Sequence, residues 1–287
     1  MLDHLTIHEP KSVMEASSLL TEFGSDAAIY AGGTELLVVM KERLIHFPHL
    51  INIKTIPGLD SISLDGDSIS IGALATHRAI ERSALVREHL PLLAELEANV
   101  ANVRVRSTGT IGGNLCFAEP HSDPATLLMA WDASVVLQSS NSHREIPLSE
   151  FFTGLLETSR GQDEVLTAVR IPHPVPVGSA YERFKIHERP TATVAVTLSL
   201  SGDMVTGARI VVGSVCDRPV RIRAAEESLI GLSTVRAAEV AAAIVHDEID
   251  PTEDNFESTD YKRHLARVLT TRAIAIATAR ASGGHGG

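Results

Sequence analysis

Cysteine is scarce in this sequence, long apolar runs are absent, and acidic residues outnumber basic ones. Cys116 and Cys216 are the only cysteines among 287 residues, so the chain builds no disulfide framework and cannot ligate an iron–sulfur cluster by itself. No segment approaches the roughly 18 consecutive apolar residues of a membrane span. The formal net charge of −11 argues against a nucleic-acid or anionic-membrane partner. The N-terminus lacks the basic and apolar regions of a signal peptide, and we expect a soluble cytoplasmic protein.

Common nucleotide-binding and catalytic signatures are missing as well. The sequence has neither a Walker loop nor a Gly-x-Gly-x-x-Gly motif, so it predicts no P-loop and no Rossmann site. His4 with His8, and His121 with Asp123, have the spacing of ligand pairs, but thirteen histidines make such pairs common by chance. Cys116 is better explained as a small buried side chain than as a redox residue. We therefore predict no catalytic residue and no metal site.

Two glycine-rich stretches are the most informative features that are present. Residues 108–113 contain three glycines, and Thr110 and Asn114 flank the pair Gly112-Gly113. A second pair, Gly32-Gly33, closely follows a short apolar run. Glycine lets a ligand approach the main chain closely, and successive backbone N–H groups in such loops bind anionic oxygens. The two loops are candidates for holding the two phosphates of a dinucleotide, and the alternative is a pair of tight turns.

The N-terminal half combines helical and extended patterns. Ser12 and Glu15 form a capping box before apolar residues at helical spacing, and Gly24 suits the end of that helix. Strict alternation on both sides of Asp65-Gly66 predicts a β-hairpin. The other predicted elements are strands over 27–30, 50–53, 133–138 and 164–171, a helix over 35–43 capped by Thr34, and helices opening at Thr76, Pro91 and Asp123-Pro124.

The C-terminal part is separated by a proline-rich linker. Residues 172–178 contain three prolines, which forbid both a helix and a central strand. Three β-rich segments follow, over 181–186, 193–201 and 205–215, and then three helical patterns near 220–232, 235–245 and 259–281. Three strands with helices on one face make a separate α+β domain. Residues 282–287 are expected to form a disordered tail.

Residues 30–36 (Tyr-Ala-Gly-Gly-Thr-Glu-Leu) and 110–115 (Thr-Ile-Gly-Gly-Asn-Leu) resemble, in order and spacing, two FAD pyrophosphate loops. Loops of this kind occur in the FAD-binding (medium) subunit of molybdenum hydroxylases, the family that includes xanthine, carbon monoxide and nicotinate dehydrogenases. The resemblance implies an α+β fold. Residues 1–176 would be a vanillyl-alcohol-oxidase-like (PCMH) FAD-binding domain with subdomains of about 1–55 and 56–176. Residues 177–287 would resemble the C-terminal domain of the carbon monoxide dehydrogenase flavoprotein, with a three-stranded sheet and helices.

The same resemblance implies which residues bind the cofactor. Asp123 would accept hydrogen bonds from the adenosine ribose, although capping of the following helix is a rival role. Lys185 would lie near the isoalloxazine ring, with a solvated surface position as the alternative. Arg104 and Arg106 would face phosphate or structure a turn. The full set of implied FAD-binding residues is Ile29, Tyr30, Ala31, Gly32, Gly33, Thr34, Glu35, Leu36, Ala101 in a helix before the second loop, Thr110, Ile111, Gly112, Gly113, Asn114, Asp123, Leu166 beside the flavin ring, and Lys185.

The implied function is that of an electron-transferring subunit. Electrons would pass from [2Fe–2S] clusters of a small partner subunit through FAD on this chain to an external acceptor. Molybdopterin would lie on a large partner subunit, and the complex would be a dimer of heterotrimers. A stand-alone FAD oxidase and a flavin-free scaffold or nucleotide-binding module are the alternatives. The chain has no room for a large substrate-binding domain and no evident catalytic base, which favours the subunit.

Overall fold

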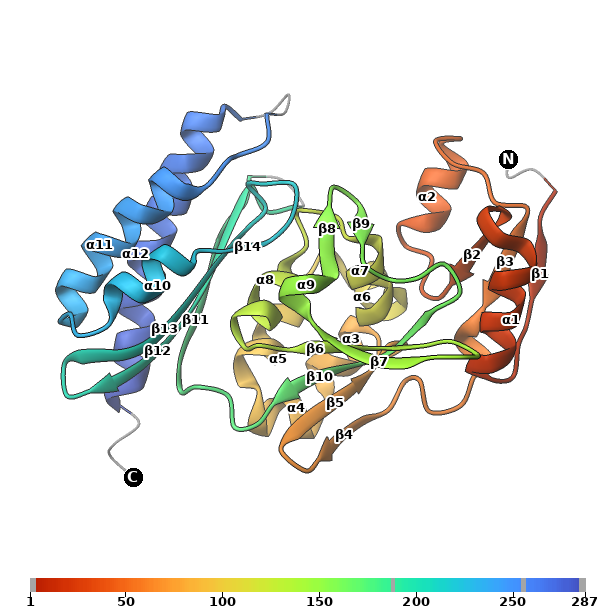
Figure 1. The fold of residues 1–287 in the computed structure, drawn as a ribbon, viewed down its shortest axis with the longest axis horizontal. Helices are drawn as coiled ribbons and strands as arrows, with labels where there is room; N and C mark the ends of the chain where they lie inside the picture. The colour runs from red at the N-terminus through yellow and green to blue at the C-terminus, as the bar shows by residue number, and fades with distance from the viewer. Residues whose placement is uncertain (1–3, 187–188, 254–256, 284–287) are drawn as a thin grey trace.

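The computed structural model describes residues 4–186, 189–253 and 257–283. Three parts follow one another along the chain and along the longest axis of the molecule (Figure 1). They are a small parallel sheet, a central antiparallel sheet with several short helices, and a C-terminal sheet covered by helices. In the part of the chain that is described, no helix is long and apolar enough to cross a membrane.

The N-terminal part is a three-stranded parallel sheet with the order β1-β3-β2. Oγ of Ser12 accepts a hydrogen bond from the backbone N–H of Glu15, as the capping box predicted, and Gly24 ends the helix with φ +54°. Thr34, by contrast, does not cap a helix. The second helix is shorter than predicted, and no side chain caps it. The elements are β1 (Thr6–His8), α1 (Val13–Phe23), β2 (Ala27–Tyr30), α2 (Leu36–Lys41) and β3 (His49–Asn52).

The central part is a five-stranded antiparallel sheet with the order β4-β5-β10-β6-β7. The predicted hairpin is present, with Gly66 in the turn at φ +57°. The strands are β4 (Ile62–Asp65), β5 (Ser68–Gly72), β6 (Ser134–Gln138), β7 (His143–Pro147) and β10 (Val165–Pro172), with a separate two-stranded ribbon of β8 (Phe152–Gly154) and β9 (Glu157–Thr158). The helices are α3 (His77–Arg82), α4 (Ala84–His89), α5 (Pro91–Glu97), α6 (Val103–Thr108), α7 (Ile111–Phe117), α8 (Asp123–Ala130) and α9 (Leu148–Phe151).

The C-terminal sheet has four strands in the order β11-β12-β13-β14, so the prediction of three strands is wrong. The error lies at residues 220–232, where a helical pattern begins with two residues that pair with β13 as an edge strand. The elements are β11 (Gly178–Phe184), β12 (Ala192–Ser201), β13 (Met204–Gly213), β14 (Val220–Arg221), α10 (Arg223–Leu229), α11 (Thr234–Glu248) and α12 (Thr259–Gly283). Of the predicted disordered tail, Ser282 and Gly283 belong to α12, and residues 284–287 lie outside the described part.

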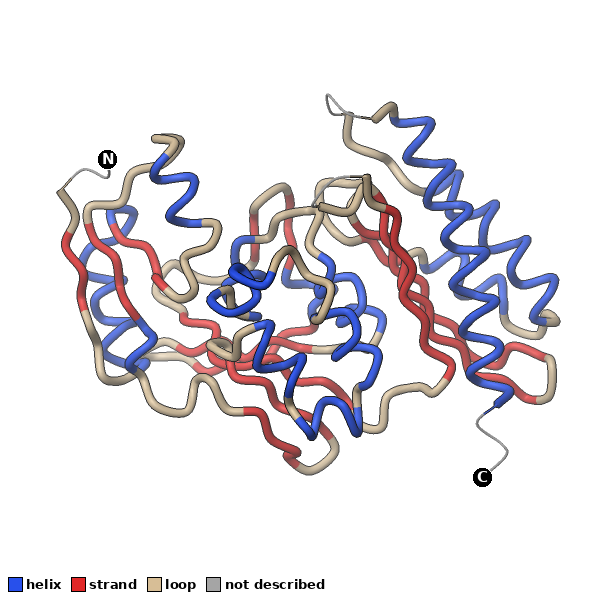
Figure 2. Tube along the Cα trace, turned by 180° about the vertical axis from the view of Figure 1, so that it is seen from behind, coloured by secondary structure: helices blue, strands red, loops and turns tan. Residues whose placement is uncertain are grey.

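Helix α8 joins the central and C-terminal parts. Helices α10, α11 and α12 lie on the outer face of the C-terminal sheet, while α8 packs against β12 and β13 from the inner face (Figures 1 and 2). Every residue of α8 is buried. Ala195 and Val211 of the C-terminal sheet belong to the same apolar cluster as the central core. The two parts therefore share one hydrophobic core.

Candidate cofactor site

The two glycine loops lie against each other. A Cβ atom on Gly32 would be 2.3 Å from the carbonyl oxygen of Thr108 and 2.8 Å from Cα of Gly109. A Cβ atom on Gly109 would in turn be 3.2 Å from Oγ1 of Thr34. Such distances are below van der Waals contact, so glycine is needed here for the close approach of two backbones. The fold therefore brings together two motifs that are far apart in the sequence.

The first loop presents unpaired backbone donors. Within the described residues, the N–H groups of Gly32, Gly33, Thr34 and Glu35 donate no hydrogen bond. Gly33 has φ +72°, a left-handed conformation that favours glycine. A Cβ atom on Gly33 would collide with the ring of Tyr30, because it would lie 2.5 Å from Cε2 of that ring. Consecutive free N–H groups around a left-handed residue form a concave anion site of the kind that binds phosphate.

The second loop is built differently from the prediction. The backbone N–H groups of Ile111 and Gly112 donate to the carbonyl oxygens of Ala75 and Ala73 at 3.0 and 2.9 Å. Those of Gly113 and Asn114 donate to Oγ1 and the carbonyl oxygen of Thr110 at 3.2 and 2.9 Å. Residues 111–114 therefore offer no free N–H group to a phosphate. They open the short helix α7, which Thr110 caps.

Gly112 and Gly113 serve different purposes in this helix. A Cβ atom on Gly112 would be 2.6 Å from Cβ of Ala73, so its glycine is required by packing. A Cβ atom on Gly113 would meet only Oγ1 of Thr110, at 2.9 Å, and would otherwise face open space. Gly113 thus borders the surface that a cofactor could approach. The hydroxyl hydrogen of Thr110 is available there because its oxygen accepts from Gly113.

Asp123 is buried at the start of α8, where Ser122 occupies the N-cap position and makes no capping hydrogen bond. Oδ1 of Asp123 accepts hydrogen bonds from the hydroxyl of Tyr181 at 2.6 Å and from Nη1 of Arg183 at 3.3 Å. Burial raises the pKa of Asp123, and the partners Tyr181 and Arg183 oppose the rise without cancelling it. Within the described residues Asp123 makes no capping hydrogen bond, so the rival role as a helix cap is not supported.

The remaining predicted residues are distributed unevenly around this site. Lys185 directly follows β11, is exposed, and acts electrostatically on Asp123. Ala101 lies in the loop between α5 and α6, not in a helix as predicted, and has φ +40°. Leu166 is 3% exposed in the central core, and Ile111 is 1% exposed. The side chains of Leu166 and Ile111 are therefore part of the central hydrophobic core, and a role of Leu166 beside the flavin ring stays a prediction.

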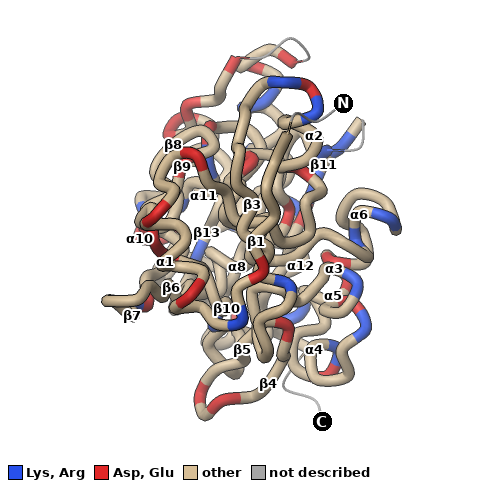
Figure 3. The backbone as a smooth tube through the Cα atoms, turned by 90° about the vertical axis from the view of Figure 1, so that its right-hand side faces the viewer, with Lys and Arg blue, Asp and Glu red and all other residues tan. Residues whose placement is uncertain are grey.

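The predicted arginines take up different positions. Nη1 of Arg106 donates to the carbonyl oxygen of Val100 at 3.0 Å, and its Nε lies 3.6 Å from Glu81. Arg106 therefore structures the turn that contains Ala101. Arg104 is exposed on the same helix, α6, where Figure 3 shows basic positions on an outer turn. Asn114 is held by Ser122, whose hydroxyl donates to its Oδ1 at 2.6 Å.

Three polar residues of this region were not predicted from the sequence. Tyr181 and Arg183 stand two positions apart on β11, which places them on one face of the strand, and that period-two spacing was the available signal. Arg189 pairs with Glu35 of the first loop and with Glu119 after the second, each at 3.1 Å. Burial acts to raise the pKa of Glu119, but His121 and Arg189 hold it below its usual value. An arginine in a loop far along the chain gives no sequence signal for such a contact.

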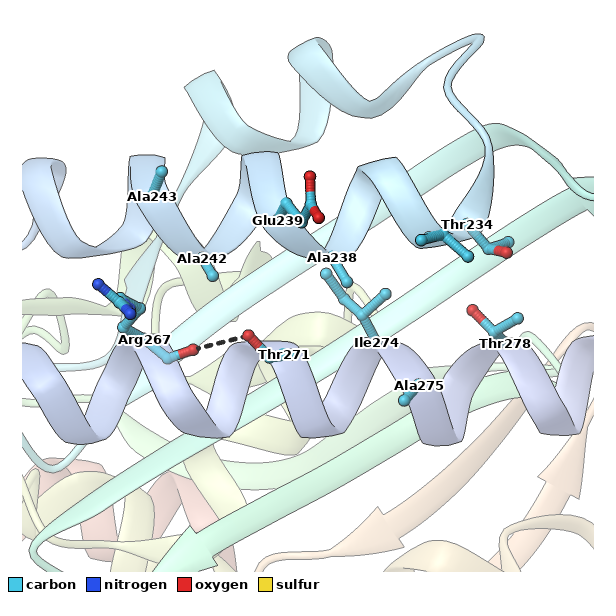
Figure 4. Close-up of a pocket in the computed structure, with 11 residues that line it drawn as sticks. Thr234, Ala238, Glu239, Ala242, Ala243, Arg267, Thr271, Ile274, Ala275 and Thr278 are labelled. Atoms are coloured by element: carbon cyan, nitrogen blue, oxygen red, sulfur yellow. Dashed lines mark hydrogen bonds between the residues drawn. The ribbon is translucent and has the colours of Figure 1, made fainter.

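Cys116 and the other candidate ligands add nothing to the site. Cys116 is half-buried, and desolvation raises its pKa to about 11, so its thiol stays protonated at neutral pH. Among the described residues, no group of three or more histidine, cysteine or acidic side chains could hold a metal ion. An open groove lies between α11 and α12, lined by small residues such as Ala238, Ala242 and Ala275 (Figure 4). None of the predicted cofactor residues lines it.

The chemistry of the assembled groups fits a dinucleotide. Four unpaired N–H groups and the hydroxyl of Thr110 are donors suited to anionic phosphate oxygens. Asp123 is an acceptor suited to vicinal hydroxyls, and Gly113 leaves space for close approach. The site is therefore compatible with FAD on its own geometry.

Comparison with known proteins identifies the family to which the chain belongs. The family model of the FAD binding domain in molybdopterin dehydrogenase matches residues 3–174, and that of the CO dehydrogenase flavoprotein C-terminal domain matches residues 179–277. The carbon monoxide dehydrogenase medium chain of Hydrogenophaga pseudoflava is 37% identical, over 95% of this chain and 96% of that protein. The caffeine dehydrogenase subunit beta of Pseudomonas sp. (strain CBB1) is 32% identical, over 94% of each.

Solved structures share the whole fold. A carbon monoxide dehydrogenase from Hydrogenophaga pseudoflava superposes with a TM-score of 0.93 at 36% identity, covering 98% of this chain and 99% of that chain. Quinoline 2-oxidoreductase from Pseudomonas putida 86 superposes with a TM-score of 0.91 at 28% identity and the same coverage. The predicted resemblance is thereby confirmed, and the chain belongs to the family of FAD-binding medium subunits of molybdenum hydroxylases.

Proposed function

We propose that this chain holds FAD non-covalently between its two glycine loops and serves as the electron-transferring subunit of a molybdenum hydroxylase. The observation that carries the proposal is the row of unpaired N–H groups from Gly32 to Glu35, in a loop that packs against Thr108 and Gly109 at the start of the second glycine-rich stretch. An anionic ligand with two phosphates matches this arrangement in charge and in hydrogen-bonding capacity.

Each residue has a defined task in this proposal. The first loop and Thr110 bind the pyrophosphate, and Asp123 accepts hydrogen bonds from ribose hydroxyls. Tyr181 and Arg183 keep the carboxylate of Asp123 in place. Lys185, exposed and close enough to act on Asp123, supplies positive charge near the isoalloxazine ring. The residues that flank the first loop (Ile29, Tyr30, Ala31 and Leu36) and Ala101 border the cofactor through the main chain or by packing.

The electrons that pass through the FAD are supplied by a partner subunit and are passed on to an external acceptor. FAD accepts electrons singly and releases them singly or in pairs, which suits a junction between one-electron clusters and an external acceptor. We propose a small [2Fe–2S] subunit as the donor and a large molybdopterin subunit as the site of substrate oxidation, assembled as a dimer of heterotrimers. The relatives named as medium chains or subunits support a multi-subunit complex.

The domain boundary and the location of the chain belong to the same proposal. We place the boundary between residues 176 and 177, with PCMH-type subdomains of about 1–55 and 56–176, because the linker before β11 joins the segments matched by the two family models. The cytoplasmic location predicted from the sequence stays a prediction.

The proposal is tested by comparing the isolated chain with the co-expressed complex. The isolated chain should be yellow with a flavin spectrum, and heterocycles, aldehydes or carbon monoxide should not reduce its flavin. The complex should show added iron–sulfur absorption, and its substrate should bleach clusters and flavin together. Substrate-dependent flavin reduction in the isolated chain would contradict the proposal and favour a stand-alone oxidase. A colourless chain that binds no flavin would favour a scaffold.

A further inference from the structure

A buried ion pair lies directly beneath the second glycine loop. Nδ1 of His77, on α3, is 2.6 Å from Oε2 of Glu97, on α5. The side chains are 3% and 0% exposed, so both are removed from solvent. Oε1 of Glu97 is buried and has no hydrogen-bond partner in the described part of the chain. Burying two ionisable groups is costly, and a pair retained in such a position calls for an explanation beyond packing.

His77 contacts the place where the two glycine loops meet. Its backbone N–H donates to the carbonyl oxygen of Gly109 at 3.1 Å. A Cβ atom on Gly109 would be 3.3 Å from Cδ2 of His77 and 3.2 Å from Oγ1 of Thr34. Because Cδ2 is bonded to Nε2, the Nε2 edge of the imidazole borders the junction of the loops. Within the described residues, no hydrogen bond to Nε2 of His77 is formed.

The charges around His77 favour its protonated form. Burial lowers the pKa of His77, but the ion pair with Glu97 and the charge of Asp123 together more than offset this effect. Asp123 on α8 acts in the same direction as Glu97, whereas Arg106 on α6, which itself pairs with Glu81 of α3, opposes it. The resulting pKa lies above the usual value for histidine, so the imidazolium persists to higher pH than on a free side chain.

We propose that His77 and Glu97 are a positioning pair for the cofactor, in which the imidazolium places a positive charge and an unused N–H donor behind the junction of the two phosphate-binding loops. This inference rests on the proposed FAD function and deepens it. Glu97 keeps His77 charged and oriented, and His77 acts through the Gly109 backbone and the space beside Thr34. While Asp123 is ionised, FAD affinity should therefore be full when His77 is protonated and should fall as pH rises through the pKa of His77.

The test measures FAD affinity of the flavin-depleted full-length chain by quenching of flavin fluorescence, from about pH 6 to pH 9.5, a range that spans a raised histidine pKa. The wild-type affinity should fall about tenfold on the alkaline side, the scale of one charge acting over several ångströms in a partly buried site. His77→Gln can still donate to Glu97 but carries no charge, so its affinity should be low at all pH values and flat. Glu97→Gln should move the midpoint to lower pH, because burial then lowers the pKa of His77 without the opposing charge of Glu97.

A matched control uses another buried carboxylate. Glu226 is buried and pairs with Arg221 at 2.8 Å in the C-terminal part, away from the loops. Glu226→Gln should lower thermal stability without changing the pH profile of FAD affinity. A His77→Gln profile that matches the wild type, or an identical change in Glu226→Gln, would show that the pair is only structural.

NMR titration of the wild-type chain gives an answer that does not depend on the folding of a variant. The ring nitrogen signals of His77 should report a higher pKa with FAD bound than without it, because affinity and protonation are reciprocally linked. An unchanged or lowered pKa would overturn the inference while leaving FAD binding intact. Failure of the wild-type chain to bind FAD at any pH would instead overturn the proposed function itself.

Discussion

Gly113 illustrates how a single missing side chain leaves room for a ligand. A Cβ atom there would press on one side-chain atom of the described residues, Oγ1 of Thr110, whereas Cβ atoms on Gly32 and Gly112 would collide with backbone atoms. The residue is helical and lies outside the left-handed region, so its role is one of space and not of backbone conformation. The glycine at this position is therefore the one most directly available to a cofactor.

Gly113→Val should remove FAD binding without unfolding the chain. The branched side chain would occupy the open face of α7 and block the approach of the cofactor, so FAD binding should be lost. The measurement is FAD affinity by fluorescence quenching, with the melting temperature measured in parallel. Gly207→Val is the control, because Gly207 lies on β13 and a Cβ atom added there would have its nearest neighbour, Ser199, at 3.4 Å. A fully flavinated Gly113→Val protein would show that the loop is only a turn.

Asp123 and Tyr181 form the second residue-scale test. Asp123→Ala should weaken FAD binding by roughly ten- to a hundredfold, the range for a charge-assisted hydrogen bond. Tyr181→Phe should weaken it less, because Asp123 remains. The pKa of Asp123 is raised by burial, so the carboxylate is lost as pH falls through that raised value, and affinity falls with it. Without the Tyr181 hydrogen bond, which lowers this pKa, the loss should begin at higher pH. Equal pH profiles in wild type and Tyr181→Phe would contradict this coupling.

At the residue scale, the sequence predicted cofactor roles for residues that belong to motifs. The fold places the loop of Gly32 against Thr108 and Gly109, and the cofactor roles of Thr110, Gly113 and Asp123 stay predictions. The sequence did not predict Tyr181, because its partner Asp123 is 58 residues away and on another element. Nor did it predict that the N–H groups after Thr110 are already used, since Ala73 and Ala75 accept them only once the fold has formed.

At the scale of elements, the contact between the two loops is the feature on which the site depends. Gly32→Ala should wedge the loops apart, since the added methyl would lie 2.3 Å from a backbone carbonyl oxygen. We expect a loss of about 1–3 kcal/mol in the free energy of unfolding together with weaker FAD binding. Chemical denaturation and FAD titration measure the two effects. Gly207→Ala is the matched control, and a Gly32→Ala chain with wild-type stability would contradict the loop contact.

Elements with strong local signals were predicted closely. The capping box at Ser12, the hairpin around Gly66 and the last two long helices lie where their periodicity placed them. The predictions failed where a tertiary contact decides the structure. Val220 and Arg221 pair with β13 as a fourth strand although the local pattern is helical. The helix after Thr34 begins later than predicted, and the loop before it is left with free N–H groups.

At the scale of the whole molecule, α8 connects the cofactor site to the C-terminal sheet. Thr126 and Thr193 share a buried hydrogen bond of 3.1 Å, and Nε1 of Trp131 donates to Ser179 at 3.0 Å. Asp123, at the start of the same helix, is held by Tyr181 of β11. The C-terminal part therefore contributes to the position of Asp123, the proposed ribose-binding residue, as well as to the core.

This shared core predicts one cooperative unfolding transition for the full chain. Burial of α8 on all sides means that neither part can lose it without exposing apolar surface of the other. Differential scanning calorimetry should show a single transition that FAD moves to higher temperature, because a ligand that binds only the folded state stabilises it. Two transitions, with FAD shifting only the first, would show that the parts are energetically independent.

The most direct test of the central claim is the chemical identity of what the purified chain binds. Acid precipitation followed by chromatography of the supernatant should release intact FAD, close to one molecule per chain, because the loops and Asp123 match a dinucleotide and hold it without a covalent bond. Replacement of Gly113 by valine should remove that FAD from an otherwise folded protein. Release of FMN, flavin retained in the protein pellet, or a purified chain that takes up no FAD when it is supplied would contradict the account.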